Sequence, residues 1–168
     1  AWTKPDFDDS SWPEGKSAWG GGDDSYSNIG TRWEGEGADI WVRRTVTLSE
    51  IDATADYYAT YKHDDTFELY VNGQQVLSTG YTWDVSGQSV KVNRSLLREG
   101  TNVIAAHCKN NTGGAYVDFG LAKDNFPTAT QKSCVVMPTS TYYTFTCGAI
   151  DLDVVFTTPL VMDDLQLF

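Results

Sequence analysis

Cysteine is scarce in this chain of 168 residues, which holds only Cys108, Cys134 and Cys147. Three cysteines without a CxxC spacing exclude a disulfide framework and a cysteine-based metal site. Cys134 and Cys147 lie on neighbouring predicted strands and could form a disulfide. The favoured interpretation is that the cysteines are free thiols buried among apolar side chains.

Positive charge and long apolar runs are scarce as well. The 12 lysines and arginines are outnumbered by 23 aspartates and glutamates, which gives a net charge of −11. We expect a chain this acidic to bind neither nucleic acid nor an anionic membrane surface. It has no run of about 20 apolar residues, so that no membrane insertion is expected. It begins at Ala1 without a signal-peptide pattern, as a mature or excised piece of a protein would.

A helical pattern is the third feature that the sequence lacks, because no stretch of about 10 to 12 residues repeats its apolar positions every 3.6 residues. Residues 66–71 alternate strictly instead, and Phe67, Leu69 and Val71 share one face. Asn72-Gly73 follows, a pair that accepts the positive φ angles of a type I′ turn, and residues 74–77 run back. The sequence therefore predicts a β-hairpin in an all-β sandwich.

Further strands are predicted from alternation or from continuous apolar runs at 40–48, 55–61, 89–92, 103–108 and 115–121, the run at 103–108 being central in its sheet. Between them we expect an acidic loop at 63–65, an aromatic loop at 80–84 and a helical turn at 96–102. The predicted core includes Phe67, Leu69, Val71, Val103, Ile104 and Phe119.

Three aspartates cluster near the N-terminus, where turn-forming residues are frequent. Asp6, Asp8 and Asp9 could supply the oxygen ligands of a calcium ion, and we expect no other cofactor. The Gly and Glu of an EF-hand loop are missing, so that a tight turn held by Asp and Ser side chains is favoured. Phe7 and Trp12 are expected to pack inward from this turn.

Candidate catalytic groups are few. His107 lies in an apolar run and is expected to be a hydrogen-bonded core residue. His63 lies beside Asp64 and Asp65 and could form a general acid–base cluster with them. No nucleophile or oxyanion donor is identifiable near His63, so that we expect this chain to be non-catalytic.

Six motifs follow one another in order along residues 1–123. They are Phe7-Asp8-Asp9-Ser10-Ser11-Trp12, Trp41-Val42-Arg43-Arg44, His63-Asp64-Asp65, Tyr70-Val71-Asn72-Gly73, Gly100-Thr101-Asn102-Val103-Ile104-Ala105 and Asp118-Phe119-Gly120-Leu121. As a set they resemble the galactose-binding-like jelly roll, the sugar-binding domain of family 2 glycoside hydrolases and an accessory domain of many secreted bacterial proteins. The resemblance implies a sandwich of eight or nine strands that is usually not catalytic.

A second resemblance begins after the break at residues 124–127. The segments 135–148 and 151–160 are similar to the start of a domain of the glutaminase A-like family, whose gut-bacterial members place a galactose-binding-like module just before it. Strands are predicted at 133–138, 142–147 and 151–157. We therefore expect 124–168 to hold a linker and the first strands of an incomplete domain. Its apolar residues could pack on the sandwich or cause self-association.

Two classes of function follow. The chain is expected to be a carbohydrate-binding accessory module of a larger bacterial hydrolase, which the resemblance places in the periplasm, at the cell surface or outside the cell. Alternatively, it is a structural domain that orients downstream domains and binds no ligand. Two or more aromatic residues lining one open groove would favour sugar binding. The candidate sugar-binding residues are Trp33, Trp41, Asp64, Asp65, Tyr81 and Trp83.

Overall fold

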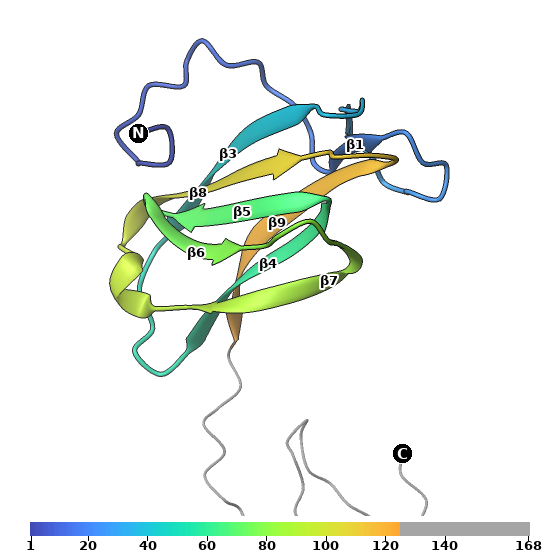
Figure 1. Cartoon of the computed structure of the whole chain (residues 1–168). Coiled ribbons are helices and arrows are strands. Elements are labelled where there is room, and N and C mark those ends of the chain that lie inside the picture. The colour runs from blue at the N-terminus through green and yellow to red at the C-terminus, as the bar shows by residue number, and fades with distance from the viewer. Residues whose placement is uncertain (125–168) are drawn as a thin grey trace, which may run out of the picture. The chain divides into compact units, whose positions relative to one another are not determined.

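The computed structural model describes residues 1–124, and Ala1–Asn125 form one compact unit (Figure 1). This part of the chain contains strands and one short 3-10 helix but no α-helix, which confirms the all-β prediction. The strands are β1 Trp19–Gly21, β2 Thr31–Arg32, β3 Asp39–Leu48, β4 Asp56–Asp64, β5 Thr66–Val71, β6 Gln74–Ser78, β7 Trp83–Val92, β8 Gly100–Lys109 and β9 Ala115–Asp124.

The strands form two sheets of a sandwich (Figure 1). One sheet has the order β2-β1-β9-β4-β7 and the other has the order β3-β8-β5-β6, and every pair except β1–β2 is antiparallel. Consecutive strands often belong to different sheets, as β4 and β5 do, which is typical of Greek-key sandwiches. β8 lies between β3 and β5, so that its predicted central position is confirmed.

The predicted core residues are all buried, with exposed fractions between 0% and 4%. Phe67, Leu69 and Val71 point into the sandwich from β5, because alternate residues of a strand share a face. Ile104 and Phe119 complete the core from β8 and β9. Val103 is also buried, although it lies on the opposite face of β8 from Ile104.

The predicted hairpin of β5 and β6 is confirmed. Asn72 and Gly73 have φ angles of 48° and 88°, in the left-handed region that the turn requires. The Asn72 amide donates to the carbonyl of Leu96 at 2.7 Å, and its side-chain oxygen accepts the backbone N–H of Val103 at 2.8 Å. The turn is therefore tied to the start of β8 as well as closing the hairpin.

Two predicted loops are wrong. β4 runs through His63 and Asp64, which pair with Val117 and Tyr116 of β9, so that only Asp65 links β4 to β5. Asp64 is accommodated in the strand because the Tyr26 hydroxyl donates a hydrogen bond to its carboxyl group. β7 begins at Trp83 rather than at residue 89, and most of its residues are exposed or half-buried, so that apolar alternation is missing.

Other local predictions also differ from the structure. β1 and β2, of three and two residues, lie in the turn-rich N-terminal region and carry no periodic pattern. The 3-10 helix is Arg94–Leu96, while Gly100, with a φ angle of 83°, begins β8 instead of ending a helical turn.

The predictions for the C-terminal part lie outside the described residues. They are the strands at 133–138, 142–147 and 151–157, the pairing of Cys134 with Cys147, and the second domain at 124–168. Among residues 1–124, the structure contains no helix that is long and apolar enough to cross a membrane.

Candidate functional site

An open groove of about 730 Å³ runs beside β3, the edge strand of the four-stranded sheet. Four of the six tryptophans of the chain line it, and we call it the tryptophan groove. Trp41 comes from β3, Trp19 from β1, and Trp33 follows directly after β2. Trp12 comes from the N-terminal segment. The groove is thus built from three parts of the chain.

Trp19 and Trp33 are held by the core of the sandwich, against which both side chains pack. The Trp19 ring stacks on Phe119 of β9, with ring centroids 6.3 Å apart. The backbone N–H of Trp33 donates to the carbonyl of Gly20 at 3.0 Å. The Trp33 indole Nε1 is buried and has no hydrogen-bond partner within residues 1–124, so that this donor is unused there. These two rings form the rigid part of the groove.

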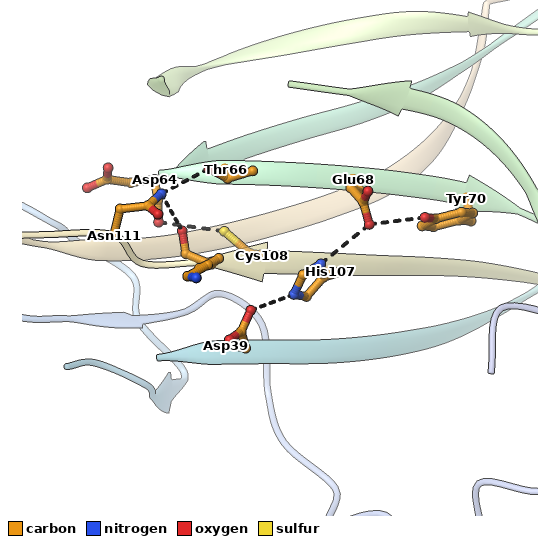
Figure 2. A network of polar contacts seen from close by, with 9 residues as sticks. Asp39, Asp64, Thr66, Glu68, Tyr70, His107, Cys108 and Asn111 are labelled. Atoms are coloured by element: carbon orange, nitrogen blue, oxygen red, sulfur yellow. Dashed lines mark hydrogen bonds and ion pairs between the residues drawn. The ribbon is translucent and has the colours of Figure 1, made fainter. Parts of the chain in front are cut away.

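Trp41 is 47% exposed and points outward from β3, where its ring lies flat on His107 of β8. The ring centroids are 4.9 Å apart and the ring planes differ by 8°. Figure 2 shows His107 between two carboxylates: Nε2 lies 2.7 Å from Asp39 Oδ1, and Nδ1 lies 3.4 Å from Glu68 Oε2. The Tyr70 hydroxyl donates to Glu68 at 3.0 Å. These contacts fix the orientation of the imidazole that supports Trp41.

The rim of the groove is formed by the N-terminal segment, which Arg43 anchors to the sheet. Arg43 Nε donates to Asp9 Oδ2 at 2.6 Å, and its guanidinium also donates to the carbonyls of Trp2 and Lys4. The carboxylate that Arg43 binds thus comes from the N-terminal segment and not from a neighbouring strand. Arg43 therefore holds the rim near Trp12 and is not free to bind a ligand.

Phe7 and Trp12 were expected to pack inward, but they are half-buried and form a small aromatic cluster within the N-terminal segment instead of joining the core. The Trp12 ring lies 5.7 Å from Phe7 in an edge-on arrangement and stacks on Trp2 at 6.3 Å. The Arg43 guanidinium lies over the Phe7 ring, 5.2 Å from its centroid. This cluster stabilises the rim, because cation–π and aromatic contacts add to the burial of the rings.

Asp64 and Asp65 are buried, with exposed fractions of 6% and 2%, and do not line the tryptophan groove. Asp65 Oδ2 accepts the backbone N–H groups of Asn111 and Thr112 at 2.7 and 3.1 Å. Asp64 accepts a hydrogen bond from the Tyr26 hydroxyl. Burial raises the pKa of Asp64 to about 6. These carboxyl groups hold two loops in place within the described chain.

Tyr81 and Trp83 are exposed, by 61% and 63%, but they do not line the groove. Trp83 lies at the start of β7, where it pairs with Asp64 of β4. Of the six predicted sugar-binding residues, the structure therefore brings Trp33 and Trp41 together in one groove. It places Asp64 next to Trp83 on β4 and β7, outside this groove.

His63 is 2% exposed, and its imidazole stacks on Phe67 with ring centroids 5.1 Å apart. Burial lowers the pKa of His63, because the charged form loses its hydration. Its Nδ1 lies 2.5 Å from the backbone oxygen of Asp65. His63 is thus packed in the sandwich and does not reach a substrate from this position. Cys108 is likewise a buried free thiol, and burial raises its pKa to about 12.

The aspartates of the predicted calcium turn have other partners. Asp8 Oδ1 accepts the backbone N–H of Ser10 at 3.0 Å, which is the turn contact that the sequence favoured, and Asp9 binds Arg43. Within residues 1–124, no group of three or more His, Cys, Asp or Glu side chains is arranged to hold a metal ion, and Asp6 belongs to no such group.

The sequence did not point to Trp12, Trp19 or the Asp39–His107–Glu68 contacts as parts of a site. His107 was expected in the core, yet its side chain is 22% exposed and lies on the outer face of the sheet. Alternation along β8 places His107 and Ala105 on that face, but the strand pairing that brings Trp41 opposite His107 was not readable from the sequence.

No protein-family profile and no curated protein matches the chain. Solved structures are similar to part of it. A β-glucuronidase of Faecalibacterium prausnitzii is 22% identical, with a TM-score of 0.37 over 44% of this chain and 12% of its own. A family 2 glycoside hydrolase of Bacteroides cellulosilyticus is 17% identical, with a TM-score of 0.43 over 54% of this chain and 13% of its own. The chain thus spans about an eighth of either enzyme, and its function is argued below from its own residues.

Proposed function

We propose that the sandwich of residues 1–123 is a non-catalytic, carbohydrate-binding accessory module of a larger secreted bacterial hydrolase. The observation that supports this is the tryptophan groove, in which Trp33 and Trp41 meet two further indoles. The parent enzyme would be glutaminase A-like or glycoside-hydrolase-like, as the sequence resemblances imply, and its active site would lie in downstream domains of the same polypeptide.

The chemistry of the groove suits a saccharide. An indole offers a flat apolar face to the C–H groups of a sugar ring, and Trp41 presents such a face on a rigid sheet. The volume of about 730 Å³ lies within the range of small-molecule binding sites. Because Trp19 and Trp33 are fixed by the core, little side-chain entropy is lost when a ligand binds.

Polar groups beside the aromatic surface would supply hydrogen bonds to sugar hydroxyls. Ser10 and Glu14 line the groove and carry oxygen atoms of this kind. Asp39 and Glu68 flank His107 next to Trp41 but do not line the groove. Orientation and specificity in sugar sites come from a few polar groups of this kind.

The alternative is a purely structural domain whose groove is covered by a neighbouring domain of the parent protein. The packing of Trp19 and Trp33 on the core supports this alternative, because the same rings would also serve an interdomain contact. The two functions differ in what the isolated chain does: a binding module retains sugars, whereas a structural domain does not.

A glycan array with the full chain, followed by calorimetric titration of the best-retained glycan, tests the proposal. Trp41→Ala should weaken binding by about 1–3 kcal/mol, the value of one aromatic stacking contact. Trp83→Ala is the control, since Trp83 is more exposed than Trp41 and lies outside the groove. An array that retains no glycan would favour the structural alternative. A Trp41→Ala variant that binds a retained glycan as the unchanged chain does would show that the glycan does not bind in the tryptophan groove.

A further inference from the structure

A second depression, of about 550 Å³, crosses the outer face of the five-stranded sheet over β9, β4 and β7. It adjoins the tryptophan groove at Ser17 and Arg44, but none of the tryptophans lines it. Its lining is mostly polar and includes Thr60, Gln88 and Ser89. The depression is therefore a separate surface with a different chemistry.

Two glycines create the space. Gly120 of β9 pairs with Thr60 of β4, and a Cβ at Gly120 would lie 3.4 Å from Thr60 Oγ1. Gly87 of β7 has a φ angle of 105°, and a Cβ there would lie 3.2 Å from Cε of Lys62. The floor is consequently free of a side chain at Gly120, while the Lys62 stem lies over Gly87.

Lys62 and Asp118 are charged residues of this depression that are unpaired within residues 1–124. They are direct cross-strand partners of β4 and β9, yet they form no ion pair, because the Lys62 stem lies across Gly87 instead. Neither side chain has a hydrogen-bond or ion-pair partner within residues 1–124. By contrast, Lys91 and Lys123 of the same sheet are both paired with aspartates, at 2.7 and 2.9 Å.

Arg44 supplies a second cation at the β9 end of the depression. β1 covers β9 only as far as Val117, and Arg44 reaches the open edge beyond it, where Nη1 donates to the carbonyl of Phe119 at 3.2 Å. The guanidinium keeps further donors for a ligand. The lining thus carries two cations and one carboxylate, Asp118, on a chain whose net charge is −11.

We propose that this depression binds an acidic sugar unit, a ring that carries a carboxylate or a sulfate. The anionic group lies against Lys62, and ring hydroxyls bond to the Arg44 guanidinium, Asp118 and Ser89. The unpaired charge of Lys62 selects this ligand, because an anion is repelled from most of the remaining surface of a chain whose net charge is −11. The site is independent of the tryptophan groove and does not rest on it.

Calorimetric titration of the full chain with three tetrasaccharides tests this site: one of galacturonic acid, its carboxyl-reduced neutral counterpart, and a sulfated form of the neutral one. The galacturonate tetramer is expected to bind at least about tenfold more tightly than the neutral tetramer, as one or two charge-assisted hydrogen bonds would give. The sulfated tetramer shows whether the site accepts sulfate or requires a carboxylate.

Lys62→Met keeps most of the stem over Gly87 and should weaken galacturonate binding about tenfold. Lys91→Met is the control, because it removes the same charge from the same sheet outside the depression. Trp41→Ala should leave galacturonate binding unchanged, so that this site and the groove can fail separately. Lys62→Gln is a second substitution that removes the charge of Lys62. The melting temperatures of all variants show whether each of them is folded. Equal binding of neutral and acidic tetramers, no binding of any at millimolar concentration, or a Lys62→Met variant that binds normally would overturn the proposal.

Discussion

Asp64 should make the stability of the sandwich fall as the pH rises from about 4 to 7. Its carboxyl group is buried and bonded to the Tyr26 hydroxyl, and burial, together with the neighbouring Asp65, raises its pKa from 3.8 to about 6. In the unfolded chain the group ionises near its ordinary pKa. Between these two values the folded state binds more protons than the unfolded state, so that the free energy of unfolding decreases with pH.

The size of the expected change in the free energy of unfolding follows from the pKa shift of Asp64. Two pKa units correspond to about 3 kcal/mol, which is fully present below pH 3.8 and is lost as the pH rises through 6. Asp64→Asn removes this titration, because an amide does not ionise in this range. The free energy of unfolding of the unchanged chain, relative to Asp64→Asn, should therefore drop by about 2–3 kcal/mol between pH 4 and 8.

Urea unfolding of both chains, followed by tryptophan fluorescence at pH steps from 4 to 8, measures this difference. Asp84→Asn is the control, because hydrogen bonds from Ser86 and Gln88 hold the pKa of Asp84 below its usual range. Its effect on stability should stay constant between pH 4 and 8. A difference between the unchanged chain and Asp64→Asn that is flat with pH would show that the carboxyl group is not held as the structure has it.

Four further predictions concern the core, the N-terminal turn, calcium and the absence of catalysis. Leu69→Ala should destabilise the sandwich by about 2–5 kcal/mol, because Leu69 is fully buried; an unchanged thermal melt would remove Leu69 from the core. Asp9→Asn should cost about 1–3 kcal/mol, since the Arg43 side chain is only 6% exposed and loses its ionic partner. Calcium or a chelator should leave the melting temperature unchanged, and a rise with calcium would restore the metal site at Asp6, Asp8 and Asp9. The full chain should hydrolyse neither glutamine nor aryl glycosides, and turnover that is abolished by His63→Ala would contradict the non-catalytic assignment.

The elements that sequence reasoning found are those with a strong local pattern. β5 and β6 were predicted with their turn, because Phe67, Leu69 and Val71 alternate and Asn72-Gly73 follows at once. β7 was found only at its C-terminal end, since most of its side chains face solvent and need not be apolar. β1 and β2 are too short to show any period.

The candidate site could be predicted only in part from the sequence, because it depends on contacts between segments that are distant along the chain. Trp33 and Trp41 were proposed as single aromatic residues, but their common groove arises because residues 31–33 and residues 40–44 line the same space. Asp64 and Asp65 were expected in a loop, where carboxylates usually lie. Their burial depends on donors from Tyr26 and Asn111, which are 38 and 46 residues away along the chain.

The most direct test of the central claim follows the indole N–H signals of all six tryptophans by NMR while the best-retained glycan is added to the full chain. Each signal is assigned by a single substitution. The tryptophan groove predicts that the signals of Trp33 and Trp41 shift in proportion to occupancy, while that of Trp83 stays in place. A glycan that shifts Trp83 alone, or a chain that retains no glycan and shows no shifted signal, would contradict carbohydrate binding in this groove.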